Sequence, residues 1–189
     1  MEKPVLYFPS DVEWRVWLSE NHSKYSQGVY LIFHKVEAAT PSMRWEEAVK
    51  VALCYGWIDS TVKSLGDGKR RQYFCPRNPK STWSALNKRH ITELESDGLI
   101  HETGYAIIEN AKTSGKWNEM DDVENLIIPE DLQVSFTDNP EAYTNYKNFS
   151  PSYRKNYLSW LHNAKRETTR NTRISEIIAL CKANKKQRP

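Results

Sequence analysis

Hydrophobic and polar residues recur with different periods along the chain, and each period predicts a type of element. Apolar residues follow helical spacing over 14–18, after a capping box that begins at Ser10, which predicts a first helix. Residues 28–36 are rich in β-branched and aromatic side chains and apolar on both alternating sets, as in a central strand covered on both faces. The helical period returns over 45–56, which predicts a second helix.

The next segment predicts a β-hairpin followed by an irregular loop. Residues 57–65 read as extended, and residues 69–75 form the returning strand. Between them, Gly66-Asp67-Gly68 supplies the positive φ values that a tight turn requires. Two prolines bracket residues 76–80, so this stretch cannot be regular.

Two helices are predicted after the loop, over 83–97 and 103–115, and a glycine marks the end of each. The chain then becomes acidic and loses the helical period over 117–129. This change predicts a connector with a short strand at 126–128. We place the domain boundary at its end.

The C-terminal part is predicted to be all helical. Asn139-Pro140 and Ser150-Pro151 each place a capping residue before a proline suited to the first helical turn, and two or three helices should complete the chain. The expected fold class is therefore α+β. A small mixed or antiparallel sheet packed with helices should occupy residues 1–128, and an all-helical domain should occupy residues 129–189.

Composition excludes several classes of protein. The chain has 189 residues, a mean hydropathy of −0.74 and no run of about 18 apolar residues, so we expect no membrane span. Prolines and charges interrupt the apolar stretch at the N-terminus, so we expect no signal peptide and a cytoplasmic location. Cys54, Cys75 and Cys181 lie far apart, which argues against a disulfide framework and a structural zinc.

The formal charge of +3 hides a segregation of charge along the chain. Residues 63–89 carry 8 basic and 1 acidic residue, residues 90–146 carry 2 basic and 13 acidic, and residues 147–189 carry 11 basic and 2 acidic. Two basic blocks beside an acidic one can form a surface that attracts anions. Alternatively, the basic C-terminal block lies against the acidic middle of its own chain.

Asp59 is the first candidate for chemistry, because the predicted strand places its carboxylate between apolar residues. Burying a bare carboxylate costs on the order of several kcal/mol. It must therefore accept hydrogen bonds or pair with a cation such as Arg71, Arg77 or Lys80. Its role is either that of a general base, that of a group orienting a substrate-binding Arg, or that of an internal ion-pair partner.

The second candidate is an anion pocket at the start of the helix predicted from about residue 83. Arg77 and Lys80 bring full charges, Ser81 and its neighbours bring hydroxyls, and a helix N-terminus presents unpaired N–H groups. A phosphate or a carboxylate would suit such a pocket. In the alternative interpretation, Trp83 is core, the hydroxyls are caps, and Arg71 and Arg77 pair with carboxylates.

Other chemistries find little support. Cations recur over 164–174, where they can contact phosphate backbones or pair with neighbouring Glu at helical spacing. The sequence has no P-loop, no dinucleotide-binding glycine motif, no nucleophile elbow and no zincin motif. The five histidines show no ligand spacing. We therefore expect no metal and no cofactor.

Three groups of motifs carry a family resemblance: residues 52–60 (Ala-Leu-Cys-Tyr-Gly-Trp-Ile-Asp-Ser), Ser81-Thr82-Trp83-Ser84 with Asn87, and a C-terminal segment with Ser150-Pro151-Ser152 and Trp160. With them, nearly the whole chain resembles the bacterial YdeI/OmpD-associated proteins, also called bacteriocin-protection proteins. The resemblance implies an α+β N-terminal part, a helical C-terminal part and an association with tolerance of cationic antimicrobial peptides or bacteriocins. It implies no catalytic residues.

Three functions remain open for this sequence. The first is a non-enzymatic protein for anionic-ligand binding or stress protection. The second is a hydrolase or transferase acting on a phosphorylated or carboxylated metabolite, with Asp59 as base. The third is a nucleic-acid-binding module that uses both basic blocks. The predicted ligand site comprises Trp57, Asp59, Arg71, Tyr73, Arg77, Lys80, Ser81, Trp83 and Asn87.

Overall fold

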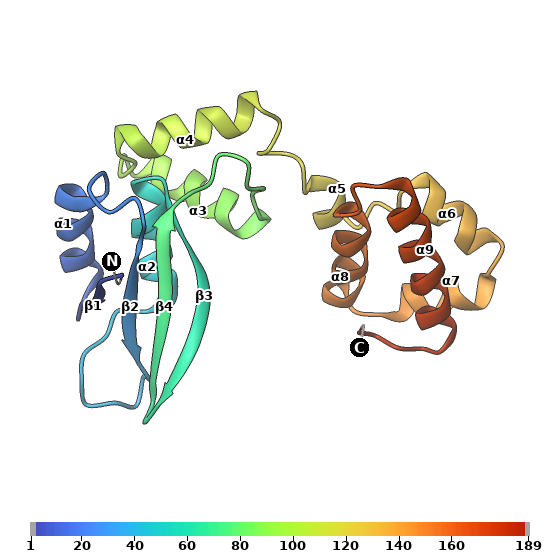
Figure 1. The fold of residues 1–189 in the computed structure, drawn as a ribbon, viewed down its shortest axis with the longest axis horizontal. Helices are drawn as coiled ribbons and strands as arrows, with labels where there is room; N and C mark the ends of the chain where they lie inside the picture. Colours follow the sequence, from blue (N-terminus) through green and yellow to red (C-terminus); the bar gives the residue numbers. More distant parts are fainter. Residues whose placement is uncertain (1–2, 188–189) are drawn as a thin grey trace. The chain divides into compact units, whose positions relative to one another are not determined.

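The computed structural model describes residues 3–187 and divides into two compact units. Unit 1 extends to Asn118 and unit 2 begins at Glu119 (Figure 1). The boundary predicted from the sequence, between residues 128 and 129, lies within unit 2. The α+β fold class is confirmed, because unit 1 contains a mixed sheet with helices and unit 2 is all helical.

Unit 1 contains a four-stranded sheet and four helices in its described part. Their order is β1 (Val5–Tyr7), α1 (Asp11–Asn21), β2 (Val29–His34), α2 (Trp45–Cys54), β3 (Trp57–Gly66), β4 (Lys69–Pro76), α3 (Ala85–Ser96) and α4 (Glu102–Thr113). The strand order in the sheet is β1-β2-β4-β3, with β1 parallel to β2 and the other neighbours antiparallel. The predicted hairpin is therefore confirmed. Strand β1 lies at the edge of the sheet and was not predicted from the sequence, because it has only three residues.

The sheet has two different faces. Val29, Leu31 and Phe33 of β2 are buried in the core, whereas Tyr30 and the other alternating residues are half-buried. In Figure 1, α2 lies behind β2 and β4. The prediction that β2 is covered on both faces is thus wrong, because within unit 1 the helices cover the face of Leu31 and leave the other face only partly covered.

Tryptophans build the core between the sheet and the helices. The Trp14 ring packs edge-on against Trp57 and Phe74, at centroid distances of 6.3 and 5.8 Å. Its Nε1 donates to the carbonyl of Ala48 at 3.2 Å, which ties α1 to α2. Gly104 of α4 lies so close to the carbonyl oxygen of Cys54 that an added Cβ would be 2.3 Å away. This close approach fixes α4 against the end of α2.

Unit 2 is a helical bundle around its own apolar core. Its helices are α5 (Asp121–Glu124), α6 (Glu130–Thr137), α7 (Pro140–Asn148), α8 (Pro151–His162) and α9 (Glu167–Lys182). The core includes Leu132, Phe136, Tyr157, Leu161 and Ile177.

The sequence predicted the connector before unit 2's longer helices incorrectly. The predicted strand at 126–128 is absent from the described residues, and a short helix, α5, precedes it. The acidic residues at 121–124 suit a first helical turn, and Leu126 then turns the chain with a φ of 59°. Four helices follow residue 129 in the described part, rather than two or three. The extra helix is α6, whose eight residues bury only Leu132 and Phe136.

Candidate functional site

Asp59 is held by neutral donors. Strand β3 places it opposite Phe74, on the helix side of the sheet. Its Oδ2 accepts from Trp45 Nε1 at 2.8 Å and from Gln72 Nε2 at 2.5 Å. Within residues 3–187, no ion pair joins this carboxylate to a cation. Of the two expected ways of satisfying Asp59, hydrogen bonding is the one observed, and it links α2 to the sheet.

Arg77 is built into the core at the end of β4. It is 6% exposed, and its guanidinium carbon lies 3.8 Å from the centroid of the Trp83 ring. Nη2 donates to the carbonyl of Thr82, and the backbone N–H donates to the carbonyl of Gly56 at 2.8 Å. Burial lowers the pKa of Arg77 to about 10, so the side chain stays charged at neutral pH. Arg77 therefore joins β4 to the loop before α3.

The hydroxyls before α3 bond to their own loop and helix. Ser81 Oγ donates to the carbonyl of Asn78 at 2.8 Å, and Ser84 Oγ accepts from the Asn87 backbone N–H at 3.2 Å as the cap of α3. Lys80 is exposed. Trp83, like Trp57, is a core residue. An anion pocket at this helix start stays a prediction.

The nine predicted site residues thus fall into separate groups. Arg77 packs on Trp83, Asp59 bonds to Trp45, and Trp57 bonds through its Nε1 to the carbonyl of His22 at 3.3 Å. Arg71 and Tyr73 share the opposite face of the sheet, where their alternating positions in β4 place them.

A cavity of about 850 Å³ lies elsewhere in unit 1, at the end of the sheet where the β3–β4 turn is. We call it the hairpin pocket. The end of β2, the connection to α2, the first residue of α2 and both strands of the hairpin line it. Its cationic lining residues are Lys35, Arg44, Lys69 and Arg70, and its one acidic lining residue is Glu37.

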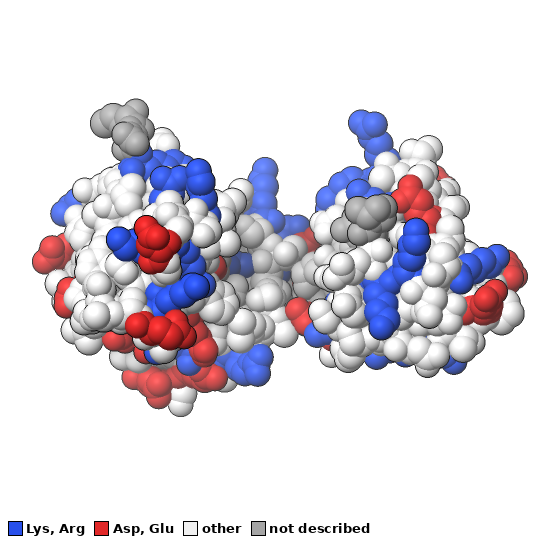
Figure 2. Space-filling model, turned by 90° about the horizontal axis from the view of Figure 1, so that it is seen from below, with Lys and Arg blue, Asp and Glu red and all other residues white. Residues whose placement is uncertain are grey.

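The cations of the hairpin pocket lack carboxylate partners. Within residues 3–187, no ion pair involves Lys35, Arg44, Lys69 or Arg70. Arg70 instead lies over the ring of Phe33, 5.3 Å from its centroid. Figure 2 views unit 1 from this end of the sheet, where Lys and Arg side chains lie among Asp and Glu side chains. The pocket therefore carries an excess of positive charge.

Backbone contacts hold the pocket's rim in place. The Lys35 N–H donates to the carbonyl of Gly68 at 2.8 Å, and the His34 N–H donates to Ser42 Oγ at 3.1 Å. Tyr7 Oη donates to the carbonyl of Pro41. These bonds fix the segment 35–44 against the hairpin, so the cations are presented by anchored backbone.

Local sequence signals point to only half of this pocket. Lys69 and Arg70 belong to the basic block at 63–89, but Lys35 and Arg44 are isolated cations in a mixed segment. The pairing of His34 with Lys69 across β2 and β4 brings the two pairs together. The local sequence does not contain the register between β2 and β4, which are not consecutive in the chain.

The described residues contain no group of three or more His, Cys, Asp and Glu placed to hold a metal ion. Across residues 3–187, no helix combines the length and apolar character needed to cross a bilayer.

Comparison with known proteins assigns the two parts of the chain to two family models. Residues 6–107 match the model described as domain of unknown function (DUF8412), and this match spans more than half of the chain. The chain belongs to the DUF8412 family. Residues 125–184 match the model described as "Bacteriocin-protection, YdeI or OmpD-Associated". No curated protein and no solved structure matches the chain.

The second match confirms the resemblance inferred from the sequence and defines its extent. The YdeI/OmpD-associated model covers the helices of unit 2 from residue 125 onwards. The N-terminal motifs at 52–60 and 81–87 fall instead within the DUF8412 match. This DUF8412 chain thus combines an N-terminal α+β domain with a C-terminal YdeI/OmpD-associated domain.

Proposed function

We propose that the protein binds a small anionic ligand in the hairpin pocket and does not transform it. The observation that carries this proposal is a set of four cations, Lys35, Arg44, Lys69 and Arg70, around a cavity of about 850 Å³, and none of their side chains forms an ion pair in the described chain. Ligand pockets commonly have volumes of about 300–1,000 Å³.

Electrostatics favours an anion as the occupant. Like charges gathered around one cavity repel each other, and a phosphate or carboxylate relieves that repulsion while accepting charge-assisted hydrogen bonds. Arg44 and Arg70 can each bind such a group through two parallel N–H groups. Phe33, Met43 and Trp45 also line the pocket and offer apolar surface to the rest of the ligand. The ligand class is therefore a phosphorylated or carboxylated metabolite with an apolar or planar part.

Binding without turnover is supported by the state of Asp59. This carboxylate was the candidate base, but its Oδ2 already accepts two hydrogen bonds, from Trp45 and Gln72. The residues that line the pocket include no Cys and a single carboxylate, Glu37, and within residues 3–187 no hydrogen bond joins Ser64 of the lining to His34. We therefore assign Asp59 a positioning role for Trp45, one of the walls of the pocket.

A role in stress protection completes the proposal. The description of the family that matches residues 125–184 names bacteriocin protection, and we extend this role to the whole chain, with the anion as the signal or cargo. A cytoplasmic location stays a prediction.

Thermal unfolding of the full chain with inorganic phosphate, pyrophosphate, nucleotides and dicarboxylates tests the pocket. A ligand present at a hundredfold excess over Kd should stabilise the protein by about 2.7 kcal/mol. The double variant Arg44→Ala, Arg70→Ala should abolish this stabilisation. The matched control Lys80→Ala, Arg89→Ala removes the same charge from exposed residues outside the pocket lining and should retain it.

Each other outcome contradicts the proposal. Stabilisation that survives loss of Arg44 and Arg70 places the ligand elsewhere. Stabilisation lost in the control instead favours the site predicted before α3, to which Lys80 belongs. If no anion in the panel stabilises the protein, anion binding is wrong.

A further inference from the structure

The sheet of unit 1 has a second surface, which is separate from the lining of the hairpin pocket on the helix side. We call it the open face, because within unit 1 it points away from α2 (Figure 1). Strand pairing aligns its side chains in two rows across the sheet. The first row is Val5, Tyr30 and Tyr73, and the second is Tyr7, Ile32, Arg71 and Lys63.

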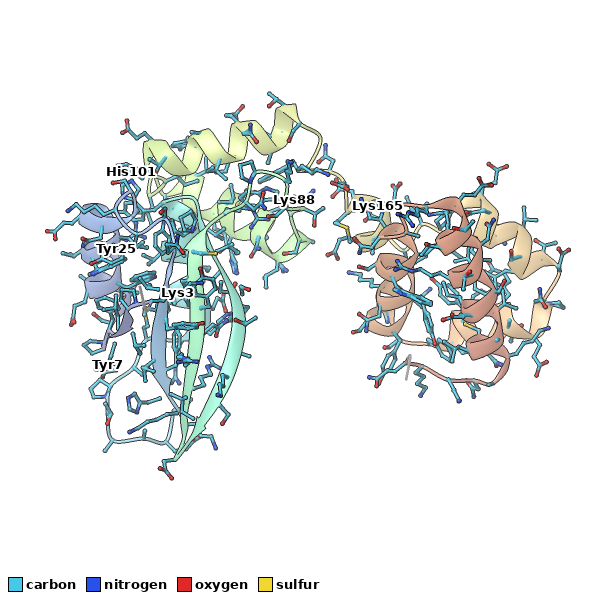
Figure 3. All side chains as sticks on the ribbon, in the orientation of Figure 1. Lys3, Tyr7, Tyr25, Lys88, His101 and Lys165 are labelled. Atoms are coloured by element: carbon cyan, nitrogen blue, oxygen red, sulfur yellow. The ribbon has the colours of Figure 1, made fainter. Side chains whose placement is uncertain are left out.

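The open face carries positive charge without negative charge. Lys63 and Arg71 stand on it from the hairpin, and Lys3 reaches it from the segment before β1. No Asp or Glu occupies a position on this face in β1 to β4, and none of the three cations forms an ion pair within residues 3–187. Figure 3 shows Lys3 over β2 and β4 in that view.

Two aromatic rings lie side by side among these cations. The centroids of Tyr30 and Tyr73 are 5.3 Å apart. The guanidinium carbon of Arg71 lies 4.3 Å from the Tyr30 centroid, and Lys3 Nζ lies 4.0 Å from the Tyr73 centroid. These contacts alternate planar and cationic groups along the face.

Hydrogen bonds hold Tyr73 in a fixed orientation. Its Oη donates to the carbonyl of Gln27 at 2.5 Å and accepts from Lys3 Nζ at 2.9 Å. The hydrogen bond to Tyr73 Oη raises the pKa of Lys3. A ring fixed in this way loses little conformational entropy when a ligand stacks on it.

We propose that the open face binds single-stranded nucleic acid. Cations that lack carboxylate partners neutralise phosphates, while exposed bases stack on tyrosine rings and on the guanidinium plane of Arg71. A duplex keeps its bases in a continuous stack, so they cannot stack on protein side chains unless the strands separate. The alternation of rings and cations therefore suits an unpaired strand better than a duplex, and it is independent of the ligand proposed for the hairpin pocket.

Fluorescence anisotropy of labelled oligothymidylate and oligouridylate with the full chain tests this proposal. Arg71→Ala should weaken binding about tenfold and reduce the slope of log affinity against log salt by about 0.7, the value for one phosphate contact on a single strand. Tyr30→Leu should weaken binding about tenfold and leave the slope unchanged, because it removes stacking but no charge.

Arg70→Ala is the matched control. Arg70 is the next residue along β4, carries the same charge and lies on the opposite face, so affinity should stay within about twofold. Unfolding curves confirm that each variant folds. If Arg71→Ala fails to fold, Lys63→Gln at an exposed position replaces it, with the same expected loss of slope.

Several results would overturn the proposal. These are no binding of any single strand by the native protein, equal affinity for a duplex of the same sequence, equal weakening by Arg70→Ala, or full competition by an acidic peptide. Arg44→Ala separates the two proposals. It should remove anion binding in the hairpin pocket and leave oligonucleotide affinity unchanged, so either proposal can fail without the other.

Discussion

The two basic blocks of the chain are used differently in the two units. In unit 2, cations of the C-terminal block pair with carboxylates of the acidic segment: Lys155 Nζ lies 2.6 Å from Glu124 Oε2, and Arg170 Nη2 donates to Asp131 Oδ1 at 2.9 Å. In unit 1, the hairpin cations Arg70 and Arg71 lie over aromatic rings instead.

This difference separates charge that stabilises the fold from charge that is available to a ligand. A cation paired with a carboxylate of its own domain has its field largely neutralised, so it attracts external anions weakly. A cation over an aromatic ring keeps its net charge and its free N–H groups. Sequence charge alone treats both blocks alike. We therefore propose the block at 63–89, rather than the one at 147–189, as the binding surface, although Lys147 and Arg173 of the second block also lie over aromatic rings.

Arg77 differs from the other basic residues of the block at 63–89 because it is buried in the core of unit 1. Its removal should therefore have the largest effect on stability. Arg77→Ala deletes the stack on Trp83, leaves the carbonyl of Thr82 without its donor and opens a cavity, so we expect a loss of about 2–4 kcal/mol in the free energy of unfolding. Urea unfolding measures it.

The control for Arg77 keeps its volume. Arg77→Met fills the site with apolar atoms and removes a buried charge that has no carboxylate partner, so it should lose less stability than Arg77→Ala. If Arg77→Ala and the native protein have the same midpoint of urea unfolding, Arg77 does not stabilise the core. It would then not differ from the exposed cations of the hairpin.

The Asp131–Arg170 pair should have a smaller effect, in unit 2. The pair joins α6 to α9 through two hydrogen bonds and is partly exposed, with 40% of the Asp131 side chain accessible. Asp131→Asn should therefore cost about 0.5–1 kcal/mol. A double-mutant cycle with Arg170→Gln isolates the coupling, and a coupling of zero would show that this cation is as available as those of the hairpin.

The pH dependence of stability gives a second test of the Asp131–Arg170 pair. The hydrogen bonds from Arg170 hold the pKa of Asp131 below its usual value of 3.8. The folded state thus binds the proton less readily than the unfolded state, so the contribution of the pair is present above pH 3.8 and is lost as pH falls through the lower, folded pKa. Unfolding measured from neutral to strongly acidic pH should show this loss in the native protein and not in Asp131→Asn. Parallel curves would contradict it.

The sequence predicted local structure better than it predicted the site. The Gly66-Asp67-Gly68 turn has three residues with positive φ, and this pattern between two extended stretches indicated the hairpin. The hairpin pocket, in contrast, depends on the register that pairs His34 with Lys69, and no local signal encodes that pairing. Asp59 shows the same limit, since Trp45, its partner 14 residues earlier, is placed by the packing of α2.

The smallest expected effect concerns the hairpin cations themselves. Lys69→Ala combined with Arg70→Ala removes two exposed charges that have no ion pair in the described chain, so stability should change by less than about 0.5 kcal/mol. Relief of repulsion with Lys35 and Arg44 offsets the lost contact of Arg70 with Phe33. The same variant should lose affinity for the anion in the hairpin pocket. If the variant loses anion affinity but keeps its stability, Lys69 and Arg70 serve ligand binding. If it loses stability instead, these two cations stabilise the fold, as Arg170 does in unit 2.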